Sequence, residues 1–341
     1  MLERGPLHKQ GIRWIILFGV FAAGMAAGVV ADRFWPGGAE EPEHAEKREG
    51  GYTFINPLLE CNPAPGSIRF WEYRRVQQEI ENYLGDAVRR KQLMLGSVYF
   101  RDLNSGPSFG VNSREQFSPA SMLKVPLMIA CLKMAESRPA YLKKRLIYQG
   151  TDFNKAKTFQ GAAAIEPGKG YTVEELIRMM MVHSDNNAMK LLFDDLDAGF
   201  RRKVYKELGI LDMTRTGEHI MSVEKFAFCY RILFNASYLS RDISEQALRY
   251  LSHRDFSLGI IRGVAPGIAV AQKYGERLHA NDVKELHDCG IVYYPNMPYL
   301  LCVMTRGEDY TALADAVRDI SSIVFTAVSK HQAEHRAGGS K

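Results

Sequence analysis

The sequence predicts a mixed α/β (α+β) domain: a five-stranded antiparallel sheet, flanked by the domain's first and last helices, with an inserted all-α lobe. Two observations predict it. Apolar, β-prone runs occur in two regions, 93–111 and 268–305, and the region between them, 119–263, looks mainly helical. Strands from both ends of a domain complete one sheet when its termini meet, so the helices between them form a separate lobe.

The first half of the sheet follows a helix. Apolar residues recur at helical spacing over 67–90, which predicts an amphipathic helix. An apolar, β-prone run over 93–100, a turn at 104–107 and a short run at 108–111 predict a hairpin. These elements begin the α/β lobe, which we place at 67–118 and 264–330.

The α lobe is expected over 119–263. Thr172 and Glu175 form a capping-box pattern that opens a helix through Met181. Further helices are expected at 185–196, 200–208, 222–233 and 244–252.

The chain then returns to the sheet. Turn residues separate three expected strands, 268–274, 287–294 and 299–305. A last helix is expected over 310–328, before a polar tail at 331–341.

Composition limits the function classes. The chain has 341 residues, 46% hydrophobic and 24% charged, which is ordinary for a globular protein with a large core. Its formal charge of +5 is spread along the sequence without a basic block, so no nucleic-acid partner is expected. None of the five cysteines forms a C-x-x-C pair, so no metal site is expected, and we expect mostly buried free thiols.

The N-terminal region predicts a membrane anchor. Residues 14–31 carry no charge, are near the minimum length for a spanning helix, and follow three basic residues in 1–13. We therefore expect a cytoplasmic N-terminus, a single-pass anchor and an extracytoplasmic catalytic domain. Residues 32–66, rich in Gly, Pro and charge, predict a flexible stalk.

Two features of this segment leave alternatives open. Its end at Ala31 also fits a signal-peptide cleavage site, and a cleaved chain would be secreted. Gly24 and Gly28 form a G-x-x-x-G pattern, which allows a weak helix dimer.

Ser121 and Lys124 form an S-x-x-K motif at an expected helix start. Residues three apart lie on one face of a helix, so the amine can take the serine proton. The apolar residues that follow would partly desolvate Lys124 and lower its pKa. An ordinary helix start is the alternative interpretation.

Two further motifs follow in the chain. Ser184, Asp185 and Asn186 interrupt an apolar helical run, and Lys273, Tyr274 and Gly275 end a β-prone run. Taken singly, each also fits a structural interpretation, a helix cap and a strand end.

Together the three motifs resemble those of the class A β-lactamase and penicillin-binding protein superfamily, S-x-x-K, S-D-N and K-[ST]-G. The segments 117–126, 171–187, 290–295 and 300–305 also resemble that family, so the resemblance covers about 68–330. It implies a β-lactamase/transpeptidase-like fold without cofactor or metal.

The resemblance also implies roles for these residues. Ser121 would attack an amide carbonyl, Lys124 would take or relay its proton, and Ser184 would protonate the leaving nitrogen beside Lys273. Asn186 would bind the substrate's acylamide group. Backbone N–H groups of Ser121 and Glu276 would form the oxyanion hole, and Gly275 would also line the substrate site.

The sequence departs from the family in two places. The Glu-x-x-Leu-Asn segment that activates the deacylating water is missing, and Glu218 is the nearest carboxylate in chain order. Tyr274 replaces the usual Thr or Ser that helps to bind the substrate carboxylate, and we expect it to line the substrate site in that place. Glu276 would repel that carboxylate, and His287 falls roughly where some relatives have a carboxylate-binding Arg; a core-facing strand histidine is the alternative.

We rank an acyl-enzyme-forming serine hydrolase first, with a β-lactam or a peptidoglycan-like D-alanyl peptide as substrate. It would be either an efficient β-lactamase or a D,D-peptidase-like enzyme that β-lactams acylate but that releases them slowly. A non-catalytic binding module on the same fold is the third hypothesis.

Overall fold

The computed structural model describes residues 45–48, 51–62, 70–104, 106–155, 157–159, 161–210, 219–253 and 255–338. The expected anchor at 14–31, with Gly24 and Gly28, the cytoplasmic segment 1–13 and most of the expected stalk lie outside these residues. Within the described residues, no helix combines the length and the apolar character that a bilayer span requires.

A five-stranded antiparallel sheet organises the fold, as the sequence predicted. Its order is β4-β3-β9-β8-β7, so strands from both ends of the chain meet at β3 and β9. The strands are β3 (Leu95–Asp102), β4 (Ser108–Val111), β7 (Val270–Leu278), β8 (Lys284–Val292) and β9 (Tyr299–Gly307).

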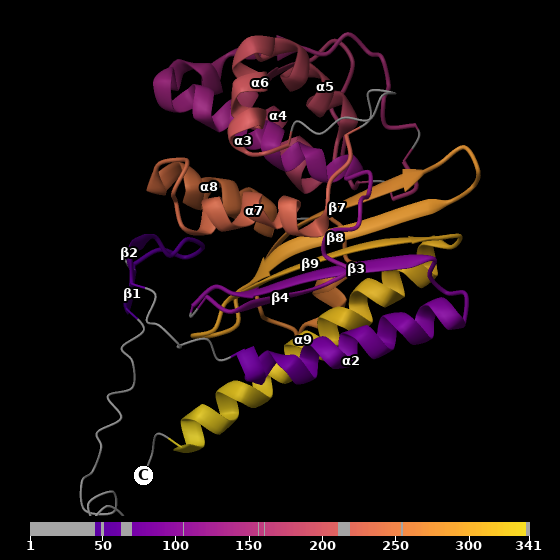
Figure 1. Cartoon of the computed structure of the whole chain (residues 1–341). Helices are drawn as coiled ribbons and strands as arrows, with labels where there is room; N and C mark the ends of the chain where they lie inside the picture. The colour runs from indigo at the N-terminus through magenta and orange to yellow at the C-terminus, as the bar shows by residue number, and fades with distance from the viewer. Residues whose placement is uncertain are drawn as a thin grey trace, which may run out of the picture. The chain divides into compact units, whose positions relative to one another are not determined.

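Two helices cover one face of the sheet, α2 (Phe70–Arg89) and α9 (Tyr310–Gly338) (Figure 1). Alternate strand residues such as Phe100 and Leu301 point into this layer, where they are buried with Val317 and Ile320 of α9. The helix α9 continues past its expected end at residue 328 into the segment expected to be a polar tail, which corrects that boundary.

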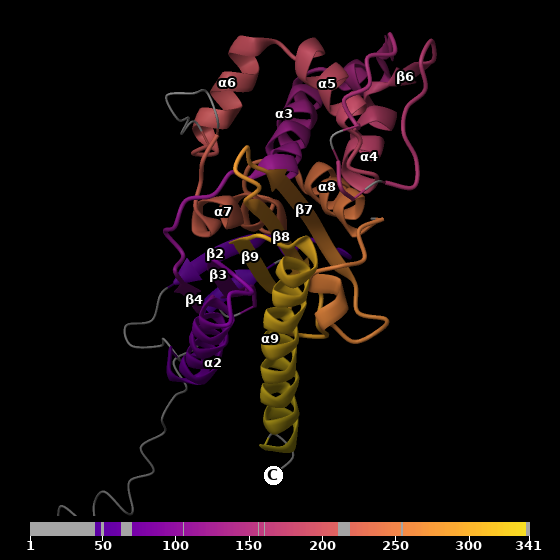
Figure 2. The same cartoon turned by 90° about the vertical axis from the view of Figure 1, so that its right-hand side faces the viewer.

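The helical lobe lies on the other face (Figures 1 and 2). Strand residues that alternate with the first set, including Tyr99 and Met304, are buried in its core. Its helices are α3 (Lys124–Ser137), α4 (Val173–Val182), α5 (Asn186–Asp195), α6 (Ala198–Glu207), α7 (Val223–Phe234) and α8 (Arg241–Ser252). The capping box of α4 is confirmed: Thr172 Oγ1 accepts from the Glu175 amide, and Glu175 Oε2 accepts from the Thr172 amide.

Part of the expected stalk is fixed to the domain. Strands β1 (Ala45–Arg48) and β2 (Leu58–Asn62) pair in an antiparallel ladder. Between them Ile55 is buried, its amide donates to Glu245 Oε2 of α8 across 3.0 Å, and the Asn56 amide donates to Phe234 O of α7 across 2.8 Å. The expectation of a flexible stalk is therefore wrong for this part, because its apolar residues and amides find partners on the helical lobe.

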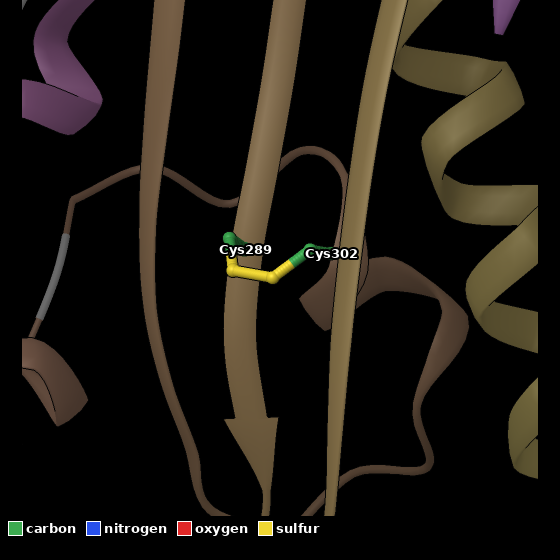
Figure 3. Close-up of a disulfide and its surroundings, with 2 residues drawn as sticks. All are labelled: Cys289 and Cys302. Atoms are coloured by element: carbon green, nitrogen blue, oxygen red, sulfur yellow. A yellow bond between two sulfur atoms is a disulfide. The ribbon is translucent and has the colours of Figure 1, made fainter. Parts of the chain in front are cut away.

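Two cysteines form a disulfide, whereas mostly free thiols were expected. Cys289 of β8 and Cys302 of β9 lie directly opposite each other and form a disulfide (Figure 3). Cys131 and Cys229 are buried free thiols, as expected, and burial raises the pKa of each to about 12.

Candidate active site

Ser121 lies in a short 3-10 turn, η1 (Ala120–Leu123), that leads directly into α3. Its side chain is partly exposed, and Lys124 lies one helical turn later with Nζ 3.1 Å from Ser121 Oγ. The preceding residue, Ala120, has a φ of 49°, a left-handed conformation that costs energy for a residue with a β-carbon. The strained turn presents the serine hydroxyl to the amine, as the S-x-x-K motif predicted.

Lys124 Nζ has two neighbours that only accept hydrogen bonds. They are the Ser184 carbonyl oxygen at 2.8 Å and Asn186 Oδ1 at 2.6 Å. Ser184 Oγ lies 2.9 Å away in addition to Ser121 Oγ. A neutral amine has two N–H groups and one lone pair, so donation to the two acceptors leaves the lone pair facing the hydroxyls. The contacts therefore suit a general base.

The surroundings of Lys124 favour that neutral form. The residue is 1% exposed, and burial holds its pKa well below the ordinary lysine value. The positive charges of Lys273 and Lys157 lower the pKa further, against the smaller opposite effects of Asp185 and Glu276.

The turn between α4 and α5 brings the S-D-N residues to Lys124. Ser184 is buried with a φ of 52°, a second left-handed residue at the site. Asp185 caps α5 by accepting from the amides of Asn187 and Ala188, and its other oxygen accepts from Ile165 N across 2.7 Å. The buried carboxylate thus holds the strained turn in place.

The third motif lies on the edge strand β7, where Gly275 contacts the turn 118–123 that carries the candidate nucleophile Ser121, here called the nucleophile turn. A β-carbon at Gly275 would lie 2.5 Å from Pro119 O and 3.2 Å from Met122 N. Only glycine allows this approach, which brings the backbone around Glu276 next to Ser121.

Lys273 lies on the same face of β7 as Gly275, because strand residues two apart share a face. It is 2% exposed, and burial, followed by the charge of Lys157, lowers its pKa to about 7. Its Nζ lies 4.2 Å from the centre of the Tyr274 ring.

Residues 152–165, which we call the crossing segment, connect the S-D-N turn to β7; residues 156 and 160 lie outside the description. Asn154 donates to Asp185 Oδ1 and accepts from the Asn186 amide, at 3.0 and 2.8 Å. The amides of Thr158 and Phe159 donate to the Glu276 carboxylate at 3.0–3.1 Å. The segment therefore bridges the two sides of the site.

The crossing segment also supplies a lysine that sequence reasoning missed. Lys157 is partly buried, and its Nζ donates to the His183 carbonyl oxygen across 3.1 Å. Its charge acts on both Lys124 and Lys273. No motif contains Lys157, and nothing in its local sequence distinguishes it from a surface lysine.

This geometry can be compared with known proteins. The sequence profile of the β-lactamase enzyme family matches residues 75–328 of the chain. The chain belongs to the β-lactamase enzyme family. No curated protein matches the chain.

Solved structures share the β-lactamase fold at low sequence identity. PBP-A is 22% identical, with a TM-score of 0.63, over 75% of this chain and 97% of that chain. The β-lactamase of Sphaerobacter thermophilus is also 22% identical (TM-score 0.63), over 74% and 97%. The class A β-lactamase of Mycobacterium abscessus is 21% identical (TM-score 0.64), over 73% and 99%. The predicted fold is thereby confirmed.

Tyr274 stands where the β-lactamase family has Thr or Ser, and its side chain has partners within the protein. Its ring stacks on Phe256 with the centroids 4.0 Å apart, and its hydroxyl donates to Phe159 O across 3.1 Å. Tyr274 therefore anchors the crossing segment, and its expected role in substrate binding stays a prediction. Glu276 also differs from expectation, because its carboxylate accepts from the same segment.

Asn186 lies beside Lys124, but its side chain already has partners. Its Oδ1 accepts from Lys124, and its Nδ2 donates to Phe153 O of the crossing segment across 3.0 Å. The Nδ2 group has two N–H donors, so its second N–H can still bind a substrate acylamide.

His287 is a core-facing strand histidine, the alternative to a carboxylate-binding role. It is fully buried, its Nδ1 accepts from the Thr305 amide at 3.2 Å, and its Nε2 lies 3.0 Å from Ser118 O. Because Nδ1 accepts, the proton lies on Nε2, and the neutral ring donates to Ser118. Through its bond to Ser118, His287 of β8 thus supports the start of the nucleophile turn.

Glu218, the nominated deacylation carboxylate, lies outside the described residues. Asp185 and Glu276, the carboxylates that act on Lys124, both accept from backbone amides. Among the described residues, no group of His, Cys, Asp and Glu is arranged to hold a metal.

A cavity of about 290 Å³ adjoins the site behind the crossing segment. Phe159, His183, Asp255 and Tyr274 contribute to its wall, and Ser121 does not. His183 Nδ1 lies 2.6 Å from Asp255 Oδ2, which also accepts from the Ala162 amide. This pair secures the far end of the crossing segment.

Proposed function

We propose that the chain is a serine acyl-hydrolase that forms an acyl-enzyme through Ser121 with a β-lactam or a D-alanyl-peptide-like amide. One observation carries the proposal: the buried amine of Lys124 lies 3.1 Å from Ser121 Oγ while acceptor-only oxygens take up its N–H groups. Because Lys124 is held as the neutral amine, it can accept the serine proton without first losing a proton of its own.

The chemistry follows from these contacts. Ser121 Oγ attacks the amide carbonyl while its proton passes to Lys124 Nζ. The oxyanion is stabilised by the backbone N–H groups of Ser121 and Glu276, which Gly275 brings together. Ser184 Oγ, 2.9 Å from Lys124 Nζ, relays a proton to the leaving nitrogen as the C–N bond breaks. The acyl group stays on Ser121 until water hydrolyses the ester.

We further propose that this ester is long-lived, as in a D,D-peptidase-like enzyme. In class A β-lactamases a Glu-x-x-Leu-Asn segment activates the deacylating water, and this sequence lacks that segment. Among the described residues, Asp185 and Glu276 are the carboxylates that act on Lys124, and amides occupy both. A mutant of PBP-A was solved as an acyl-enzyme complex with penicillin G, which is consistent with stable acylation on this fold.

The proposed location is outside the cytoplasm, with residues 14–31 as the anchor. Their charge-free sequence after basic residues supports this orientation, and a disulfide between β8 and β9 is typical of oxidising compartments. Protease treatment of intact spheroplasts should degrade the domain of the full chain. Protection until lysis would contradict the proposal.

Acylation is tested by intact-mass analysis of the full chain after addition of penicillin G. We expect an adduct equal to the whole penicillin, because the opened ring stays attached, and no adduct on Ser121→Ala. Lys124→Met should slow adduct formation by about 10²- to 10⁴-fold, the usual contribution of a general base. Lys133→Met, on the same helix, is the matched control. A persistent adduct supports the peptidase-like enzyme, rapid turnover the β-lactamase, and no reaction the binding module.

A further inference from the structure

The crossing segment leaves the S-D-N turn and returns to it. Near its start, Asn154 Nδ2 donates to Asp185 Oδ1 across 3.0 Å, and near its end the Ile165 amide donates to Asp185 Oδ2 across 2.7 Å. Asp185 is buried. One buried carboxylate therefore holds both ends of the segment, which has the form of an Ω-loop, a compact surface loop whose ends lie close together.

The middle of this loop reaches β7 and the α/β lobe. The Phe159 amide donates to the Glu276 carboxylate across 3.0 Å, and the Phe159 carbonyl oxygen accepts from the Tyr274 hydroxyl across 3.1 Å. The Phe159 ring also lies edge-on to three aromatic rings, those of Phe256, Tyr274 and Tyr310, with centroids 5.6, 6.1 and 5.7 Å away. Edge-to-face contacts between aromatic rings are attractive. Phe159 thus fastens the tip of the loop to the α/β lobe.

The loop also contacts the peptide that leads into Ser184. Lys157 Nζ donates to the His183 carbonyl oxygen across 3.1 Å, and a β-carbon at Gly161 would lie 2.2 Å from the same oxygen. No side chain fits in so short a distance, so the backbone at Gly161 comes this close only because glycine has none. The loop therefore touches this peptide on its way to the tip and again on its way back.

These contacts place the loop at one end of the proposed site. In the proposed reaction Ser184 relays a proton to the leaving nitrogen, so the leaving group lies on the Ser184 side of Ser121. Lys273 is the cation expected beside that nitrogen, and its Nζ lies 4.2 Å from the centre of the Tyr274 ring, which the loop contacts. The loop thus joins the immediate neighbours of Ser184 and Lys273, across the path of a long leaving group.

We propose that the crossing segment closes the leaving-group end of the Ser121 site and that Phe159 is a specificity-determining residue. The site then accepts amides whose leaving group is short, such as one terminal amino acid, and excludes amides whose peptide continues further. The inference rests on the proposed function, because it names the substrate class of that same site.

The physical basis is the cost of opening the loop. A peptide that continues beyond its leaving residue must displace the tip and break the contacts of Phe159 with β7. Its affinity falls by the fraction of molecules in which the tip is already released. A short leaving group ends before the loop and does not incur this loss.

The test compares peptides that differ only in the length of the leaving group. In the Ser121→Ala chain, calorimetry gives the dissociation constants of N-acetyl-L-lysyl-D-alanyl-D-alanine amide and of the same amide extended by three glycines. Neither peptide carries a C-terminal carboxylate, so a preference reflects length. We expect the shorter peptide to bind more tightly. Adding Phe159→Ala should reduce this preference by about tenfold or more, because the released tip no longer excludes the extension.

Two further measurements show whether Phe159→Ala opens the loop without unfolding the domain. Trypsin cleavage after Lys157, next to the tip, should accelerate by about tenfold or more, because the released segment becomes accessible. Urea denaturation should show that the domain remains folded. Phe228→Ala is the matched control, since Phe228 of α7 is 38% exposed; it should change neither the length preference nor the cleavage.

Each outcome bears on the inference. It is overturned if the two peptides bind equally, if Phe159→Ala leaves the preference or the cleavage unchanged, if the variant weakens both peptides to the same extent, or if neither peptide binds. A length preference that depends on Phe159, combined with no acylation of the chain that retains Ser121, supports the inference and shows that the proposed function is wrong.

Discussion

The imidazole of His287 donates its Nε2 proton to the carbonyl oxygen of Ser118, three residues before the nucleophile, across 3.0 Å. The amide of Ser118 donates to Glu285 Oε2, also at 3.0 Å. Two side chains of β8 thus bind both backbone polar groups of Ser118. Burial opposes the charge of Glu285, but its interactions with His287 and with Arg306, whose Nε donates to Glu285 Oε1 at 2.8 Å, outweigh burial and lower its pKa to about 2. This anchor precedes the strained Ala120, whose conformation needs such support.

Replacing His287 should impair both stability and acylation. His287→Phe leaves the buried Ser118 carbonyl without its donor, which costs about 1–3 kcal/mol in the free energy of unfolding. We expect acylation by penicillin G to slow by roughly tenfold or more, because a small displacement of Ser121 misaligns attack. Urea denaturation and adduct kinetics measure the two effects. His279→Phe is the control, because His279 Nε2 lies 3.5 Å from Glu285 Oε2 while the Ser118 carbonyl is bound by His287. Equal acylation rates in the two variants would contradict the proposed role of His287.

The pH dependence of acylation should reflect two lysines. Lys124 has a pKa well below the ordinary value, so its neutral form predominates at lower pH than for a free lysine. Lys273 has a pKa of about 7, so it is positively charged below that pH and loses its charge as the pH rises. We expect acylation to decline above about pH 7. Lys273→Arg should remove this decline, because the arginine stays protonated. If acylation of the variant still declined, the decline would belong to another titrating group.

Weakening the anchor of the crossing segment should expose the site. Glu276→Gln offers one acceptor oxygen without charge to the amides of Thr158 and Phe159. Hydrogen exchange at these two amides should accelerate. The pH above which acylation declines should also fall, because the charge of Glu276 raises the pKa of Lys273. Glu174→Gln, on the exposed surface, is the control, and unchanged exchange would show that the carboxylate does not hold the segment.

Gly275 should tolerate no side chain. The added carbon of Gly275→Ala would lie 2.5 Å from Pro119 O, so either β7 or the nucleophile turn must shift. We expect acylation to fall by about 10²-fold or more and the free energy of unfolding to fall by about 1–3 kcal/mol. Gly85→Ala in α2 is the control: its nearest contact would be at 3.5 Å, and alanine in a helix interior should stabilise by about 0.5–1 kcal/mol. Wild-type acylation in Gly275→Ala would disprove the close approach.

Thiol mapping should separate the cysteines. Cys289 and Cys302 lie on one tryptic peptide, 285–306, which should resist alkylation under denaturing conditions until a reductant is added. Cys131 and Cys229 should react when the protein is denatured but not when it is native, since burial raises their pKa to about 12. Alkylation of Cys289 without reductant would exclude the disulfide.

Motifs predicted which residues would meet, and the structure brings Ser121, Lys124, Ser184 and Asn186 together. Spacing within one helix turn is local, so S-x-x-K alone predicts the contact between its two residues. The segment 51–57 was mistaken for stalk because its partners, Glu245 and Phe234, are distant in the chain. Strand boundaries moved by a few residues because hairpin pairing extends β7 and β8 into polar residues.

The sequence by itself determined the family, the sheet assembled from both ends of the chain, and the serine and lysine of the nucleophile turn, because periodicity and short motifs are local properties. Only the tertiary structure decided that Tyr274 and Glu276 hold the crossing segment, that His287 supports Ser118 from the core, and that Lys157 enters the site. Each of these roles depends on a contact between residues distant in the chain, and the orientation of a side chain toward such a partner is fixed only when the sheet and the helical lobe pack together.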